Sequence, residues 1–138
     1  MRMVFRIEVS CGIGGDGGAT LLGNAQPGSK PDQAYNREIA KTIKNRVKVP
    51  VFVVGGIIDP ATMVDIIQRG DADYVSLCRS LISDPEFPRK IQEGGNKPAR
   101  CIQCNLCLGY IVTEPLRCYH GKTLKDKEPL LKDILVLE

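Results

Sequence analysis

The sequence predicts an α/β protein built on a parallel sheet. Apolar runs rich in β-branched residues occur at positions 4–9, 49–54 and 73–77, helical segments separate them, and no hairpin turn joins any two. This alternation gives parallel strands linked by right-handed crossovers. The chain has 138 residues, of which 43% are hydrophobic and 25% charged. It is therefore long enough for one globular domain with its own core.

A glycine-rich loop separates the first strand from the first helix. Val4 to Val9 alternates as a strand does, and residues 12–18 then form a flexible loop. We expect Asp32 to cap a helix that runs to about Arg46. Its buried stripe is expected at positions i, i+4 and i+8, which are Ile39, Ile43 and Val47.

The second strand has little polar alternation, which predicts burial on both faces. Gly55 and Gly56 end it. Asp59 then serves as N-cap and Pro60 as the first residue of a helix that Gly70 terminates. The apolar face of this helix is expected at Met63, Ile66 and Ile67. A third strand at 73–77 and a short helix at about 84–92 complete the predicted elements.

A sheet of three strands does not bury both of its faces, so the run belongs to a larger architecture. The candidates are a doubly wound sheet and part of a (β/α)8 barrel, also called a TIM barrel. Both later strands end in residues suited to phosphate, and no G-x-G-x-x-G follows the first strand. These two observations favour the barrel, in which phosphate sites follow the last two strands.

The residues predict a phosphate site at Gly55 and Gly56, with Arg79 beside it after the next strand. Tandem glycines let backbone N–H groups approach an anion, and the helix that begins just after them adds its positive end. Arg79 follows the neighbouring strand and therefore lies at the same edge of the sheet. A tight turn and a surface salt bridge are the simpler explanations, and we favour phosphate binding over both.

Cysteines at C-x2-C-x2-C-x10-C spacing predict a metal centre. The ligands are Cys101, Cys104, Cys107 and Cys118. Thiolates suit zinc and iron–sulfur clusters alike, but three closely spaced cysteines with a distant fourth are typical of iron–sulfur proteins. We therefore rank a 4Fe–4S cluster first, zinc second and uncoordinated thiols third. Cys11, outside the motif, is expected to be a bystander.

Composition argues against several other classes. The net charge is +3, and the basic stretch at residues 41–48 has no interleaved aromatics, so it reads as a solvated helix face rather than a nucleic-acid site. No apolar run approaches the ~20 residues of a membrane span, and no signal peptide is visible. We expect a cytoplasmic protein that binds neither membrane nor nucleic acid, and metal ligation rather than disulfides.

Several motifs together resemble one known family. Residues Val51 to Pro85 look like the final βαβ unit of the Old Yellow Enzyme family, also called NADH:flavin oxidoreductases. Ile7 to Ser10 and the helix from Ala34 to Val47 are similar to its sixth βα unit. The cysteine run from Cys101 resembles the branch containing 2,4-dienoyl-CoA reductase and trimethylamine dehydrogenase. The resemblance extends to about Lys122.

The resemblance implies a fold, an activity and cofactors. The chain would be strands six to eight of a TIM barrel at 1–98, a cysteine-rich iron–sulfur segment at 99–122, and a tail at 123–138. It implies an FMN-dependent NAD(P)H oxidoreductase of the ene-reductase type, with NAD(P)H as electron donor and a small-molecule substrate. Gly55, Gly56, Cys78 and Arg79 would bind the FMN phosphate. The cluster would relay single electrons to or from FMN.

The chain departs from the family in three respects. Cys78 stands where many members have glycine, and Ser80 stands where proline is common. The first five strands, with the residues that hold substrate and the flavin ring, are expected to be absent. A companion chain or self-association would then complete the barrel. No catalytic proton donor is assigned: Tyr35, Tyr74, Tyr110 and Tyr119 do not match the family's tyrosine, and His120 reads as a loop residue.

The residue patterns alone are also compatible with other functions. A small iron–sulfur electron-transfer protein would keep the cysteines without FMN, and a zinc-stapled binding module would catalyse nothing. Another phosphate-binding barrel, such as an isomerase, would share the glycine site but has no use for the cysteines.

Overall fold

A computed structural model describes residues 5–10, 33–104, 106–109 and 115–121 of the chain. These residues belong to two compact units. The first unit comprises residues 5–10 and 33–100 and contains every strand of the described chain. The second comprises the described residues from Cys101 onward and contains one short helix, α6 (Leu106–Gly109).

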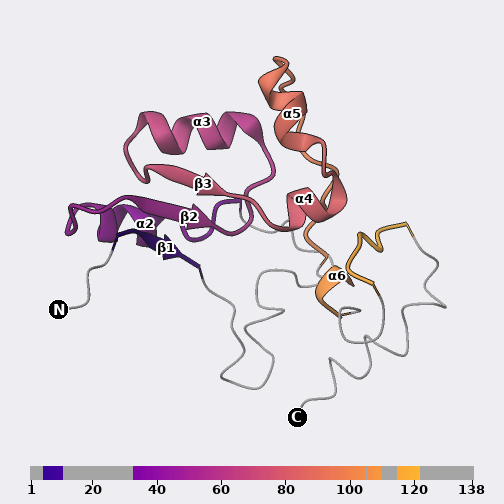
Figure 1. The fold of residues 1–138 in the computed structure, drawn as a ribbon, viewed down its shortest axis with the longest axis horizontal. Helices are drawn as coiled ribbons and strands as arrows, with labels where there is room; N and C mark the ends of the chain where they lie inside the picture. Colours follow the sequence, from indigo (N-terminus) through magenta and orange to yellow (C-terminus); the bar gives the residue numbers. More distant parts are fainter. Residues whose placement is uncertain (1–4, 11–32, 105, 110–114, 122–138) are drawn as a thin grey trace, which may run out of the picture. The chain divides into compact units, whose positions relative to one another are not determined.

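The first unit is built on a parallel sheet. Its strands are β1 (Ile7–Val9), β2 (Val51–Val54) and β3 (Tyr74–Ser76), in the order β1-β2-β3 (Figure 1). Both strand pairs are parallel, with Val9 opposite Val53 and Val53 opposite Val75. The predicted parallel sheet is thereby confirmed, in a form consistent with part of a TIM barrel.

The strands are shorter than the apolar runs that predicted them. β1 starts at Ile7 rather than at Val4, which lies outside the described residues, and β2 starts after Pro50. Proline has no N–H to give to a neighbouring strand. The carbonyl of Pro50 nevertheless accepts a hydrogen bond from the Ile7 N–H at 3.0 Å. Pairing of β1 with the chain before β2 therefore begins at this residue.

Helix α2 (Arg37–Lys44) begins later than predicted. Asp32, the expected N-cap, lies outside the described residues, and Asn36 occupies the N-cap position. The chain cannot be helical before this point, because Ala34 has a φ of +53°. The Ala34 N–H bonds to the Gly56 carbonyl at 3.3 Å instead of joining a helix. A tertiary contact thus sets the start of α2.

Helix α3 (Pro60–Gln68) begins and ends as predicted. Asp59 is its N-cap, and the Asp59 carboxylate accepts a hydrogen bond from the Ala61 N–H at 3.2 Å. Pro60 is the first helical residue. Gly70 follows the last turn with a φ of +69°, a conformation that glycine adopts without strain.

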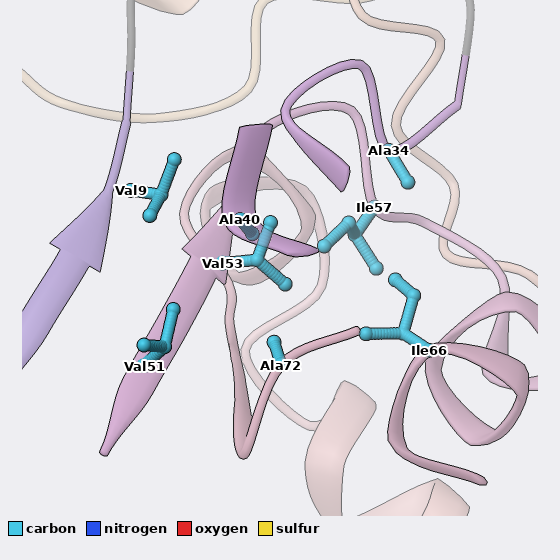
Figure 2. Close-up of a cluster of buried hydrophobic side chains, with 8 residues drawn as sticks. All are labelled: Val9, Ala34, Ala40, Val51, Val53, Ile57, Ile66 and Ala72. Carbon is cyan, nitrogen blue, oxygen red and sulfur yellow. The ribbon is translucent and has the colours of Figure 1, made fainter. Parts of the chain in front are cut away.

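The core lies between one face of the sheet and helices α2 and α3. Figure 2 shows Val51 and Val53 of β2 together with Val9, Ala40 and Ile66, all of them buried. The predictions for two core residues were wrong. Ile39 and Ile67 are 52% and 44% exposed.

The buried face of α2 runs through Asn36 and Ala40 instead of through Ile39. The Asn36 amide group donates to the Val54 carbonyl at 2.6 Å, so it holds the helix in a rotation that points Ala40 at the sheet. On the other face of the sheet, Phe52 and Tyr74 stack with ring centroids 4.5 Å apart. Tyr74 is 53% exposed there. In the described part of the chain, β2 is therefore fully buried on its helix-covered face only.

Two short helices follow β3 where one was predicted. They are α4 (Arg79–Ser83) and α5 (Phe87–Gln92). Asp84 interrupts them with an extended backbone, because the residue before a proline is disfavoured in the helical region. Within the described ranges, no helix is long and apolar enough to cross a bilayer.

Candidate functional site

The carboxyl end of β2 has a backbone that only glycine accommodates easily. Gly55 and Gly56 have φ values of +128° and +66°. A β-carbon at Gly55 would lie 2.6 Å from Tyr35 Cε2 and 2.7 Å from Asn36 Nδ2. Both the backbone conformation and the close neighbours therefore exclude larger residues at this position.

Arg79 belongs to the same edge of the sheet. It follows β3, which is the parallel neighbour of β2, and its Nη2 lies 3.4 Å from the hydroxyl oxygen of Tyr35. Because Tyr35 also contacts Gly55, the two strand ends meet at one tyrosine side chain. The sequence-predicted residues Gly55 and Arg79 are thus brought together, while Cys78 beside Arg79 is exposed.

A buried hydrogen bond joins the two loops at this edge. The Ser80 hydroxyl donates to the Ile57 carbonyl at 2.7 Å, and Ser80 is 2% exposed. The Ala99 N–H donates to the neighbouring Ile58 carbonyl at 2.8 Å. The loop after β2 is therefore anchored independently of any ligand.

One part of the predicted phosphate site is not available in the expected form. The positive end of α3 was expected to face the anion, but the Asp59 carboxylate caps it and engages the Ala61 N–H. A carboxylate at a helix N-terminus neutralises the partial charge that would attract an anion. Of the groups predicted to bind an anion here, the glycine backbone and Arg79 therefore stay as candidates, and the end of α3 does not.

Ion pairs fasten α2 to the segments that precede β3. The Arg37 guanidinium donates to buried Asp71 at 2.7 Å and reaches Asp65 at 2.7 Å. Burial raises the pKa of Asp71, but the cations of Arg37 and Lys41 lower it further, so this pKa lies below its ordinary value.

Asp73 forms a second ion pair with α2. Its carboxylate accepts hydrogen bonds from Lys44 Nζ at 2.7 Å and from the Val51 N–H at 2.8 Å. The hydrogen bond from Lys44 makes the larger contribution to lowering the pKa of Asp73, and the bond from the Val51 N–H lowers it further. These pairs hold the starts of β2 and β3 together, away from the strand ends that carry the glycines.

Sequence reasoning missed three residues of this edge: Tyr35, Asn36 and Ser80. Their positions depend on which strand end the turn before α2 touches, and no local pattern encodes that contact. A signal existed for Asn36, because asparagine is a preferred N-cap residue. Its side chain caps no helix N–H here but binds β2 instead.

The second unit contains the motif cysteines, and all of them are described. Cys107 is buried, Cys101 and Cys104 are partly buried, and Cys118 is exposed. They are thiols rather than half-cystines. The Gln103 N–H donates to Cys101 Sγ at 3.4 Å, and Gln103 has an unusual φ of +59°.

The donor types of this segment fit a metal centre, but the described geometry does not assemble one. Among the residues that the structure describes, no three His, Cys, Asp or Glu side chains lie close enough together to hold a metal ion. Nearby, the Tyr119 hydroxyl donates to the Pro115 carbonyl at 2.6 Å, and His120 is exposed. Cys11 and Tyr110 lie outside the described residues.

The described residues form an α/β unit whose three-stranded parallel sheet is consistent with part of a (β/α)8 barrel. Comparison with protein families identifies it further. The chain belongs to the NADH:flavin oxidoreductase / NADH oxidase family, whose sequence model matches residues 18–98. This match includes Gly55, Gly56, Cys78 and Arg79.

Curated relatives agree with the family. An NADH oxidase of Thermoanaerobacter brockii is 42% identical over 91 residues, 64% of this chain and 14% of the relative. A metal reductase of Desulforamulus reducens is 36% identical over 98 residues, 69% of this chain and 14% of the relative. A dimethylamine dehydrogenase of Hyphomicrobium is 38% identical over 76 residues, 54% of this chain and 10% of the relative. The chain thus spans about one seventh or less of the length of these relatives.

Proposed function

We propose that this chain carries the FMN phosphate site of an FMN-dependent NAD(P)H oxidoreductase of the ene-reductase type. The ligands are the backbone of Gly55, Gly56 and Cys78 and the guanidinium of Arg79. The observation that carries the proposal is the meeting of the two parallel strand ends within the stretch that matches the family.

The chemistry of these groups suits a phosphate monoester. Backbone N–H groups of two glycines approach an anion without obstruction by side chains, and a guanidinium binds phosphate oxygens in a planar fork. When bound, FMN supplies the hydride chemistry between NAD(P)H and a small-molecule substrate. The residues of this chain anchor the cofactor, and no catalytic proton donor is assigned among them.

We propose further that residues 1–98 form strands six to eight of a TIM barrel. Two features support this arrangement. Within the described residues the sheet ends at β1 and β3, and its uncovered face bears the stacked rings of Phe52 and Tyr74. Remaining strands, from a companion chain or by self-association, would cover this face and both edges. A cysteine-rich segment at 99–122 and a tail at 123–138 complete the proposed organisation.

The flavin proposal is tested by comparing FMN with riboflavin, which lacks the phosphate. We expect the full chain to bind FMN more tightly than riboflavin. Arg79→Ala should weaken FMN binding by about 10- to 100-fold, the effect of losing a hydrogen bond to a charged group, and leave riboflavin unaffected. Arg69→Ala is the matched control, because Arg69 pairs with Asp65 on an exposed helix end. Equal affinities for the two flavins in the unmodified chain would refute the proposal.

We propose that Cys101, Cys104, Cys107 and Cys118 hold a 4Fe–4S cluster. Besides the spacing, the N–H group directed at Cys101 Sγ supports it, since hydrogen bonds to thiolate sulfur tune such clusters. The positive φ of Gln103 is a local strain of the kind found at ligand sites. Metal binding would have to draw the thiols together, and its free energy would contribute to folding of this segment.

The metal proposal is tested on protein prepared without oxygen. We expect iron and sulfide in the chain, with broad visible absorbance that dithionite bleaches. Cys104→Ser should abolish the iron content, whereas Cys78→Ser should keep it, because Cys78 belongs to the other unit. Zinc without iron would overturn the cluster and favour a zinc-stapled module. Iron without any flavin affinity would favour a small electron-transfer protein.

A further inference from the structure

The turn before α2 lies against the end of β2, at the edge that carries the proposed phosphate site. It contributes two hydrogen bonds to that strand end. The Ala34 N–H donates to the Gly56 carbonyl at 3.3 Å, and the Asn36 side chain donates to the Val54 carbonyl at 2.6 Å. Both residues are buried, so the backbone on each side of Tyr35 is held in place.

Tyr35 itself is positioned between the two strand ends. Its ring edge lies so close to Gly55 that an added β-carbon would be 2.6 Å from Cε2 and 2.8 Å from Cζ. Its hydroxyl oxygen lies 3.4 Å from Arg79 Nη2. Arg79 is the donor in this pair, because a guanidinium accepts no hydrogen bond. The tyrosine therefore contacts the glycine backbone with its ring and the arginine with its hydroxyl.

We propose that Tyr35 is an additional phosphate-binding residue that also positions Arg79. A phenol that accepts a hydrogen bond from arginine retains its own O–H proton, which it can donate to a further acceptor. A phosphate oxygen held between the Gly55 backbone and Arg79 is such an acceptor. The ligand class is a phosphate monoester, and the inference rests on the proposed FMN phosphate site.

Loss of the Tyr35 hydroxyl should affect binding of the phosphate and leave binding of the rest of the cofactor unchanged. Tyr35 touches the residues assigned to the phosphate, so its hydroxyl should contribute to binding of FMN and of inorganic phosphate but not of riboflavin. A purely structural role would instead change the stability of the chain and its affinity for both flavins alike.

The test uses Tyr35→Phe in the full chain, which removes the hydroxyl and keeps the ring. Tyr74→Phe is the matched control, because Tyr74 is an exposed tyrosine that stacks on Phe52. We expect Tyr35→Phe to weaken FMN binding by about tenfold or more and to leave riboflavin binding unchanged. Inorganic phosphate should shift the amide resonances of Gly55 and Gly56, at about tenfold higher concentration in this variant. Tyr74→Phe should behave as the unmodified chain.

The outcomes distinguish failure of the inference from failure of the proposed function. If Arg79→Ala abolishes the preference for FMN while Tyr35→Phe keeps it, Tyr35 is no phosphate ligand and the flavin site stands. If the unmodified chain neither prefers FMN nor shows a glycine shift with phosphate, both proposals fall. Equal loss of affinity for the two flavins, with a lower urea midpoint, would assign Tyr35 a structural role only.

Discussion

Replacement of Gly55 by alanine tests the close approach on which the strand-end site depends. Two effects act against the added methyl group. A non-glycine residue at positive φ is destabilised by roughly 1–2 kcal/mol. Overlap with the Tyr35 ring and the Asn36 amide, at 2.6 and 2.7 Å, adds roughly 1–3 kcal/mol of overpacking. We therefore expect Gly55→Ala to lower the free energy of unfolding by roughly 2–5 kcal/mol.

Gly70→Ala is the control for an alanine at a positive φ that meets no neighbouring atom. Gly70 also has a positive φ, +69°, but a β-carbon there would meet no atom within 4 Å. Both variants lose the same conformational freedom in the unfolded chain. The difference between them contains the overlap, roughly 1–3 kcal/mol, together with the greater backbone strain of an alanine at the +128° φ of Gly55.

Urea unfolding followed by circular dichroism gives both values. For an m-value of about 2 kcal/mol/M, a difference of about 2 kcal/mol separates the two midpoints by about 1 M. If Gly55→Ala were no less stable than Gly70→Ala, Tyr35 would not lie against Gly55. The reasoning that places the tyrosine in the phosphate site would then be refuted.

Three further predictions concern the scaffold around the site. Ser80→Ala removes the buried hydrogen bond to the Ile57 carbonyl. It should lower the free energy of unfolding, measured by urea denaturation, by roughly 1–3 kcal/mol. Ser83→Ala should lower the free energy of unfolding by less. It removes the bond from the Ser83 hydroxyl to the Ser80 carbonyl, but that carbonyl still accepts a hydrogen bond from the Asp84 N–H. Equal losses of stability in the two variants would contradict this account. Asp73→Asn should lower stability by roughly 1–2 kcal/mol at neutral pH, since the partly exposed Lys44 loses its carboxylate partner. Because the pKa of Asp73 in the folded chain lies below 3.8, its contribution is complete above that value and disappears as the pH falls through the folded-state pKa. As the pH is lowered, the free energy of unfolding should fall less in Asp73→Asn than in the unmodified chain. Identical pH profiles would show that Asp73 does not contribute to the acid sensitivity of the fold.

Local signals were sufficient for elements whose ends are encoded nearby. Asp59, Pro60 and Gly70 mark the ends of α3, and each is found in its predicted role. The sequence likewise indicated which residues follow the strands: the glycine pair after β2 and Arg79 after β3. Such signals are recognised because capping and turn chemistry depend on a few consecutive residues.

Local signals failed where a distant contact competed with them. The periodicity of α2 favoured Ile39 as a core residue, but the bond from Asn36 to β2 points Ala40 inward instead. The helix also begins later than its polar N-terminal residues suggested, because Ala34 is committed to Gly56. Neither partner lies within a helical turn of the other, so periodicity carries no trace of these contacts.

The sequence by itself determined that this is a parallel α/β chain, because strand and helix periods, caps and glycines are local properties. It also identified the family and the strand-end residues Gly55, Gly56 and Arg79. Only the tertiary structure decided that Tyr35 joins the two strand ends and that Ser80 ties their loops together. Both contacts connect residues far apart in the chain, and their existence depends on how the segments pack.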